Sequence, residues 1–455
     1  MNTKTKTKRS LGWVTKNHVE IEQWIQKLKE SAKNNPHALI DPIQELKEMV
    51  YTDPVLYANV QGMFAEAHRY KKRTPLAWEP EPINFEEFLE LLNAIMYTAP
   101  QAYQKGKGDS QEPAGMIGFP INALLAWPMA TDFGYDVFSN SLINQQFKKI
   151  LTHWAKFLVS EESRYVLVEN DPANNAIAWL SPDAQEEMVE VAKSSLGPEP
   201  NPISVDAGFA DIFECDPKDK YYGFKCWDDF FTRQFREGIR PVYEPDNDNI
   251  IVNACESAPL GVVKDVALSA KFWLKCQTYS LENMLNFDEF APQFAGGTVY
   301  QAFLSALSFH RWHSPVNGTI VKAYVVNGSY YLENQGQGFF NTEEGPDSSG
   351  PNNSQAFLSA VATRAIIFIQ ADNPKVGLMC VMPIGMAEVS SCEITVKPGD
   401  KVKKGDELGM FHFGGSTHCL IFGPDVKLKF DTYDEIPSLD AGNIRVNTKI
   451  AEVIT

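Results

Sequence analysis

The sequence predicts an α+β protein in which a helical N-terminal domain, residues 1–214, precedes a β-rich domain, residues 215–455. Two observations predict this order. Apolar residues recur every three or four positions in the first half, whereas short β-rich runs follow one another after about residue 245. The length of 455 residues is enough for two or three domains of roughly 100–200 residues each.

The predicted helices of the first half begin at capping signals. Asp41-Pro42-Ile43-Gln44 combines a capping side chain, a proline at the first helical position and a glutamine at the third. The same start chemistry recurs at Asp53-Pro54, at Asn84 with Glu87, and at Ser181-Pro182. The segment 197–202, GPEPNP, is the clearest break in the helical pattern, because proline and glycine favour turns.

The second half contains the predicted strands. Residues 319–326, an Asn327-Gly328 turn and residues 329–332 give a hairpin signal. Residues 365–369 and 376–382 are expected as buried strands, and residues 341–355, NTEEGPDSSGPNNSQ, as a loop. These runs predict a sheet-based domain, and we find no internal repeats.

Charge and composition exclude several classes of protein. The net charge of −17 argues against a nucleic-acid partner and against stable association with an anionic membrane. The longest apolar stretch, 116–130, falls short of the run of about 18 residues that spans a bilayer and is broken by two prolines. The seven cysteines form no CxxC pair, a pattern of reduced proteins. The basic start, 1–10, has no apolar segment behind it, so we expect a cytoplasmic protein.

Two motifs contain candidate nucleophilic or acid–base side chains. Gly414-Gly415-Ser416-Thr417 is either a tight turn or the site of an acyl shift, in which the serine hydroxyl attacks the preceding carbonyl and glycines leave room for the bend. In the segment FHRWHSP, 309–315, His310 and His313 are three residues apart. They could be metal ligands, a base and an acid, or two hydrogen-bonding side chains. An HExxH-like pattern is absent, so no metal is expected.

Three further features have alternative interpretations. Glu256 follows the apolar run 250–252 and is either a rim carboxylate or the group that orients a histidine in a serine–base–acid relay. The segment 396–406 resembles a biotinyl or lipoyl carrier domain but has no modifiable lysine at its tip, so we attribute the likeness to β-sandwich geometry. His412 and His418 are spaced to share a strand face with Ser416 and are rival bases. No G-x-S-x-G elbow of a serine hydrolase is present.

Five motifs in order along residues 222–425 resemble the phosphatidylserine decarboxylase family. They are FFTR with Arg240-Pro241, Leu274-Lys275 with TYSL at 278–281, FHRWHSP, PIGM at 383–386, and Gly415-Ser416-Thr417. Cys276 replaces a usual glycine, and Glu256 stands where the family has an aspartate. LGW at 11–13 and PIQELK…DPVLY…MF at 42–64 resemble the helical region of the soluble fungal branch, which includes L-tryptophan decarboxylases.

The resemblance implies a β-rich catalytic domain that cleaves itself between Gly415 and Ser416. Ser416 would become a pyruvoyl group, which replaces pyridoxal phosphate as the electron sink of a decarboxylase. His313 would be the base for cleavage, Glu256 would hold it, and His310 would protonate the substrate Cα. The 40-residue chain 416–455 would remain a partner of the rest.

The substrate implied by the branch is a soluble amino acid, L-tryptophan, converted to tryptamine. Two alternatives are a phosphatidylserine decarboxylase that makes phosphatidylethanolamine, and a non-enzymatic β-sandwich binding protein whose GGST segment is only a turn. Membrane association distinguishes the first alternative. An intact chain after purification distinguishes the second.

Overall fold

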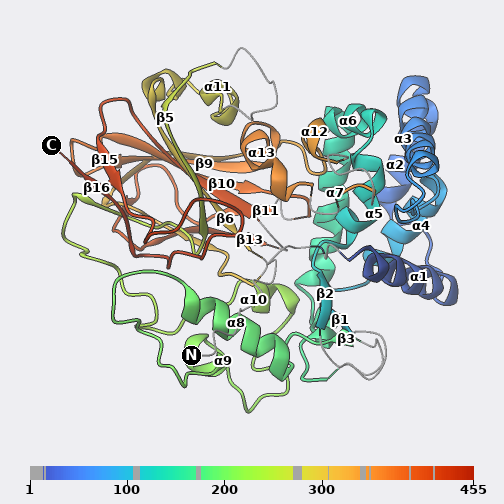
Figure 1. The fold of residues 1–455 in the computed structure, drawn as a ribbon, viewed down its shortest axis with the longest axis horizontal. Coiled ribbons are helices and arrows are strands. Elements are labelled where there is room, and N and C mark those ends of the chain that lie inside the picture. Colours follow the sequence, from blue (N-terminus) through green and yellow to red (C-terminus); the bar gives the residue numbers. More distant parts are fainter. Residues whose placement is uncertain are drawn as a thin grey trace.

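A computed structural model describes residues 14, 17–105, 113–170, 176–269, 279–305, 307–338, 345–347, 350–388, 391–412 and 416–454. It confirms the α+β class, with helices first and antiparallel sheets after them (Figure 1). Figure 1 shows α1–α7 on one side of the molecule and the large sheet on the other. Within the described ranges, every helix is too short or too polar to cross a bilayer.

The helices of the N-terminal part pack through one buried face each. Their bounds are α1 (His18–Asn34), α2 (Asp41–Thr52), α3 (Pro54–Arg73), α4 (Phe85–Ile95), α5 (Pro120–Met129), α6 (Asp132–Ser139), α7 (Ser141–Leu158), η1 (Glu161–Val166), α8 (Pro182–Ser194) and α9 (Phe209–Ile212). Helix α5 differs, because all of its residues are buried. A short sheet of β1 (Gln101–Lys105), β2 (Pro113–Ile117) and β3 (Ala176–Ile177), which the sequence did not predict, joins them.

Most of the predicted helix starts are confirmed by side-chain caps. Asp53 accepts hydrogen bonds from the backbone N–H groups at the start of α3, and Asn84 and Ser181 do the same for α4 and α8. The prediction for Asp41 is wrong by one residue. Asp41 is the first residue of α2, and Ile40 precedes it without a side-chain cap.

The β-rich part is built on a seven-stranded antiparallel sheet. Its order is β12 (Lys401–Val402), β8 (Gly318–Val326), β9 (Arg364–Ala371), β10 (Leu378–Gly385), β14 (Ser416–Phe422), β6 (Gly297–Leu304) and β5 (Ala258–Val266). Two smaller sheets have the orders β11 (Ser391–Ile394), β13 (Glu407–His412), β7 (Arg311–His313) and β15 (Leu428–Phe430), β16 (Lys449–Val453), β4 (Ile250–Val252). Short helical segments accompany them, namely α10 (Trp227–Phe231), α11 (Leu281–Met284), η2 (Ala291–Phe294), α12 (Gln335–Gly338), η3 (Asn352–Ser354) and α13 (Gln355–Val361).

The predicted strand 365–369 lies in β9, and the predicted strand 376–382 overlaps β10, which begins two residues later, at Leu378. The predicted hairpin at 319–332 is wrong. Strand β8 pairs with β9 and β12, and residues 329–332 form no second hairpin strand. Tyr331 instead packs its ring against Phe138 and Phe147 of the helical part. The hydrophobic contact with the helices therefore outweighs the local turn signal. The predicted loop 341–355 lies partly outside the described residues and ends in η3 and the start of α13.

The hydrophobic core does not divide at residue 214. One continuous cluster of buried apolar side chains runs from α1 through the large sheet to β16. Backbone pairing also crosses this position, since Leu196 pairs with Ile444 and Phe213 with Phe235. The helical part is therefore packed directly onto the β-rich part.

Candidate active site

Ser416 is the first residue of β14, a strand in the interior of the large sheet. It pairs with Gly385 of β10 on one side and with Leu304 of β6 on the other. Gly414 and Gly415, the other residues of the predicted cleavage motif, lie outside the described residues. Because side chains alternate along a strand, Thr417 and His418, the next two residues, belong to opposite faces of the sheet.

His313, the predicted base, ends strand β7. Its Nδ1 atom lies 2.7 Å from the carbonyl oxygen of Gly405, and its Nε2 atom is buried without a hydrogen-bond partner in the described part of the chain. A carbonyl oxygen can only accept, so Nδ1 carries the proton and Nε2 keeps its lone pair. Burial also lowers the pKa of His313, which favours the neutral ring. The geometry gives a neutral imidazole with a free acceptor nitrogen.

The carbonyl that orients His313 belongs to a tight turn. Gly405 has a φ of +86°, and its N–H donates to the Ser314 carbonyl at 2.9 Å. The Ser314 N–H in turn donates to the Asp406 carbonyl at 2.7 Å. A Cβ atom at residue 405 would lie 2.4 Å from Cγ2 of Val242. The position therefore requires glycine, a role that the sequence signals only through the Lys404-Gly405-Asp406 turn composition.

Glu256 is not placed beside His313. The carboxylate is 1% exposed and forms a bidentate pair with Arg240, with distances of 2.5 Å from Nη2 to Oε1 and 3.0 Å from Nε to Oε2. Oε2 also accepts the backbone N–H of Val446 at 2.8 Å. A buried carboxylate is stabilised most by a full positive charge with fork geometry, which Arg240 supplies. The expected hydrogen bond from Glu256 to His313 is therefore replaced by the Gly405 contact.

His310 lies in an apolar, positively charged environment. Its ring is fully buried and stacks on Phe231 with centroids 4.1 Å apart. Burial and the nearby Arg233 charge hold the pKa of His310 well below its usual range, although the Ser305 backbone opposes the shift. Arg233 is itself buried and donates to the Leu307 carbonyl at 3.0 Å, and burial lowers its pKa to about 9. His310 is thus neutral and next to Ser305, which follows the Leu304 partner of Ser416.

The two rival histidines have different positions. His418 lies on β14, two residues after Ser416, but it is fully buried and burial lowers its pKa to about 3. The prediction that His412 shares this strand is wrong, because His412 ends β13 and residues 413–415 separate it from β14. Its Nδ1 contacts the Asp228 carboxylate at 3.0 Å and its Nε2 contacts Glu393 at 2.8 Å. Burial lowers the pKa of His412, but these carboxylates outweigh burial and raise it.

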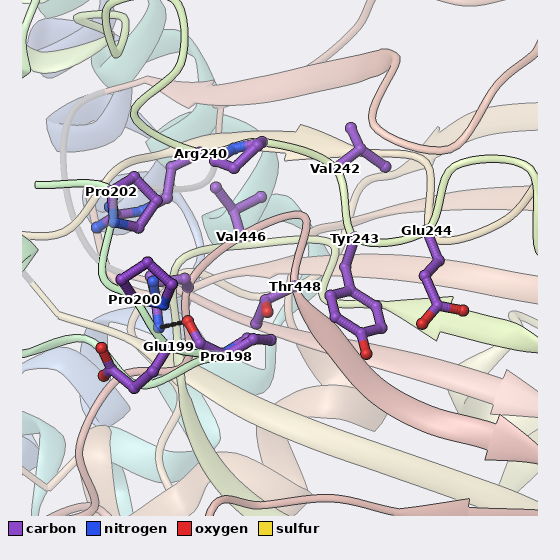
Figure 2. A pocket seen from close by; sticks show the side chains of 12 residues that line it. Pro198, Glu199, Pro200, Pro202, Arg240, Val242, Tyr243, Glu244, Val446 and Thr448 are labelled. Carbon is purple, nitrogen blue, oxygen red and sulfur yellow. Dashed lines mark hydrogen bonds between the residues drawn. The ribbon is translucent and has the colours of Figure 1, made fainter.

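Two cavities lie near these groups. The first, about 270 Å³, is lined by Arg240 together with Pro202, Tyr243 and Val446 (Figure 2). It borders the Arg240–Glu256 pair, and neither His310 nor His313 lines it. The second, about 240 Å³, is lined by Gln301, whose Nε2 donates to Thr417 Oγ1 at 3.2 Å. A residue that lines the second cavity thus hydrogen-bonds to Thr417, the residue that follows Ser416.

Chemically, these residues include the kinds of group that an attack by a serine hydroxyl uses. They are a serine at the start of an interior strand, a neutral histidine whose Nε2 has no hydrogen-bond partner among the described residues, and a second buried neutral histidine. Across the described ranges, no cluster of three or more His, Cys, Asp or Glu side chains could hold a metal ion.

Comparison with known proteins identifies the family. A family model described as phosphatidylserine decarboxylase matches residues 227–447, and a second model with that description matches residues 40–188. An L-tryptophan decarboxylase of Psilocybe cubensis is 35% identical over 90% of this chain and 88% of its own length, and one of Psilocybe cyanescens is 33% identical over 98% and 94%. Decarboxylase iboD of Amanita muscaria is 40% identical over 69% and 86%. The chain therefore belongs to the phosphatidylserine decarboxylase family and is a carboxy-lyase.

Proposed function

We propose that this protein is a pyruvoyl-dependent amino-acid decarboxylase that cleaves its own chain between Gly415 and Ser416. The observation that carries the proposal is the free, buried Nε2 of His313 together with the position of Ser416 at the start of β14. Membership of the phosphatidylserine decarboxylase family supports it. The pyruvoyl group would form from Ser416 itself, and we expect no requirement for pyridoxal phosphate.

Self-cleavage needs only groups of the chain and one water molecule. His313 Nε2 takes the Ser416 hydroxyl proton, and Oγ attacks the Gly415 carbonyl carbon, so that the peptide C–N bond breaks and an ester forms. Loss of the Ser416 α-proton expels Gly415 as a carboxylate and leaves a dehydroalanine. Addition of water then releases ammonia and leaves a ketone as the first group of the chain 416–455. That ketone supplies an electron sink for decarboxylation.

The other residues have distinct roles in this proposal. Gly405 fixes the ring of His313 through its carbonyl oxygen. His310, which is buried and neutral, would hold and deliver the proton that replaces the departing CO₂ at the substrate Cα. Glu256 would affect cleavage only indirectly, because its carboxylate contacts Arg240 and Val446. After cleavage we expect the chain 416–455 to stay bound through β14 and β16.

L-tryptophan is the proposed substrate, with tryptamine as product. Two relatives that match nearly the whole chain are named L-tryptophan decarboxylase. The net charge of −17 also opposes approach to an anionic lipid surface, which a phosphatidylserine decarboxylase has to reach. The same charge and the cysteine pattern support a cytoplasmic location.

The experiment combines intact mass spectrometry with an activity assay. Wild-type protein should give chains 1–415 and 416–455, whereas Ser416→Ala should give one intact chain. Ser438→Ala, a half-buried serine of the same C-terminal segment, is the matched control and should be cleaved. Cleaved protein should release CO₂ from L-tryptophan without added pyridoxal phosphate and leave phosphatidylserine vesicles unchanged.

Two results would overturn parts of the proposal. Cleavage of the Ser416→Ala protein at the same bond would exclude the acyl shift, and an intact wild-type chain would favour a binding protein. Production of an ethanolamine lipid from vesicles would shift the substrate to phosphatidylserine. Activity on a non-aromatic amino acid alone would keep the mechanism and reject tryptophan.

A further inference from the structure

Two connections of the β-rich part are flanked by residues that pair with one another in the sheets. Gly385 at the end of β10 pairs with Ser416 at the start of β14. Ser391 at the start of β11 pairs with His412 at the end of β13. The residues that flank the connection 386–390 therefore pair with the residues that flank the connection 413–415, whose last residue, Gly415, precedes the bond proposed to be cut. A contact that holds residues 386–388 in place acts next to Gly385, the strand partner of Ser416.

Glu388 joins the first connection to the N-terminal helical part. Its side chain is 1% exposed, and Oε1 accepts the backbone N–H of Asn122 at 2.8 Å. Asn122 lies in the first turn of the fully buried helix α5, and Phe119, which precedes the helix, offers no side-chain cap. Buried N–H groups at a helix start need an acceptor, and a carboxyl group suits the positive end of the helix dipole. Glu388 supplies this cap from 266 residues further along the chain.

A second set of contacts ties the same connection to the strand that starts at Ser416. Gln355 Nε2 lies 3.3 Å from Met386 Sδ. The Gln355 carbonyl accepts from Gln301 Nε2 at 3.1 Å, and the same Nε2 donates to Thr417 Oγ1 at 3.2 Å. Met386 and Thr417, which follow the paired residues Gly385 and Ser416, are thus linked through two buried glutamines. A displacement of the Glu388 segment would be transmitted to the start of β14.

We propose that Glu388 is a positioning residue for self-cleavage, which fastens residues 386–388, next to the strand partner of Ser416, to helix α5. The inference rests on the proposed function and gives the N-terminal helical part a role in maturation. Cleavage requires the serine hydroxyl to stand close to the carbonyl that it attacks, and a misplacement of about 1 Å can cost about 100-fold in rate. Loss of the cap would remove the hydrogen bond that holds residue 388 against helix α5.

The chain offers a matched control in Glu333. This residue is also buried, at 4% exposure, and burial raises the pKa of both Glu333 and Glu388 to about 8. Glu333 lies between β8 and α12, in a segment that pairs with neither connection. A substitution at residue 333 therefore removes a comparable buried carboxyl group that, among the described residues, has no hydrogen bond to residue 388 or to β14.

The test follows cleavage of the full-length chain after synthesis in a cell-free system, by denaturing gel and intact mass. Glu388→Ala should slow cleavage by about tenfold or more, whereas Glu388→Gln should stay within about threefold of wild type, because its amide oxygen can still accept the Asn122 N–H. Glu388→Asp keeps the carboxyl group but is one methylene shorter, so its cleavage should be slow. Glu333→Ala should be cleaved at the wild-type rate.

Each remaining result has a defined consequence. Wild-type cleavage of Glu388→Ala, or equal slowing in Glu333→Ala, would overturn the inference and leave the proposed function intact. If Glu388→Ala does not fold, the cleavage rates of Glu388→Gln and Glu388→Asp test the inference. Equal cleavage rates for these two variants would overturn it. A wild-type chain that is never cut would overturn both the inference and the proposed function.

Discussion

Replacing Glu256 by glutamine separates two explanations for this buried carboxylate. In the structure, Glu256→Gln removes the charge that pairs with Arg240, whose side chain is 3% exposed. Breaking one partner of a buried ion pair costs about 3–5 kcal/mol, because the other charge stays buried without compensation. Glu256→Gln and Arg240→Met should each lower the free energy of unfolding by about that much. The double variant should recover most of the loss, because it buries no unpaired charge.

The assay measures both stability and processing for the two single variants and the double variant. Unfolding free energies are compared in a Ser416→Ala background, so that every protein is a single chain, and cleavage rates are measured with Ser416 present. If Glu256 acts by holding the fold, stability and cleavage should return together in the double variant. A double variant with restored stability that is still not cut would refute this reasoning, because Glu256 would then act directly on the cleavage chemistry.

Three further outcomes follow from the site and the buried acids. Burial lowers the pKa of His313, so this base stays neutral at pH values below the usual pKa of histidine. The cleavage rate should hold from pH 8 to about pH 6, and a fall that begins near pH 7 would contradict the assignment. Gly405→Ala should slow cleavage by about tenfold, because its Cβ would meet Val242, whereas Gly399→Ala, with a φ of +91° and nothing within 4 Å, should not. Glu333 has a pKa raised by burial to about 8, so its stabilising effect is complete below pH 4.5 and is lost as pH rises through 8. The free energy of unfolding of Glu333→Gln, measured with urea, should rise relative to that of the wild type over this pH range, by at most about 5 kcal/mol. A difference between the two proteins that stays constant with pH would contradict this.

Local chemistry accounts for what the sequence predicted well. Asp53, Asn84 and Ser181 cap helices whose N–H groups lie two or three residues away, so their signals are complete in a few letters. The strands β9 and β10 were predicted for a similar reason, since continuous apolar runs indicate burial on both faces. His313 was singled out because its motif is short and ordered with the others, and its role as the base stays a prediction.

Contacts between distant segments account for what the sequence missed. The Asn327-Gly328 turn signal is local, but β8 takes its partner β9 from a segment that begins at Arg364. The carboxylate of Glu256 was expected at His313, yet burial made a guanidinium the better partner, and nothing in the letters shows which arginine that is. Glu388 caps a helix 266 residues earlier, so its role is visible only in three dimensions.

The interior position of β14 changes how the cleaved protein would unfold and refold. Seven residues of this strand pair with β10 and seven with β6, so the end created at Ser416 would be held in the sheet by hydrogen bonds on both sides. Before cleavage, the strand is tethered to the rest of the chain and can find its place in a first-order step. After cleavage it would have to find its place from solution, in a step whose rate depends on concentration. Cutting the chain would thus leave the native structure in place while making its loss on denaturation hard to reverse.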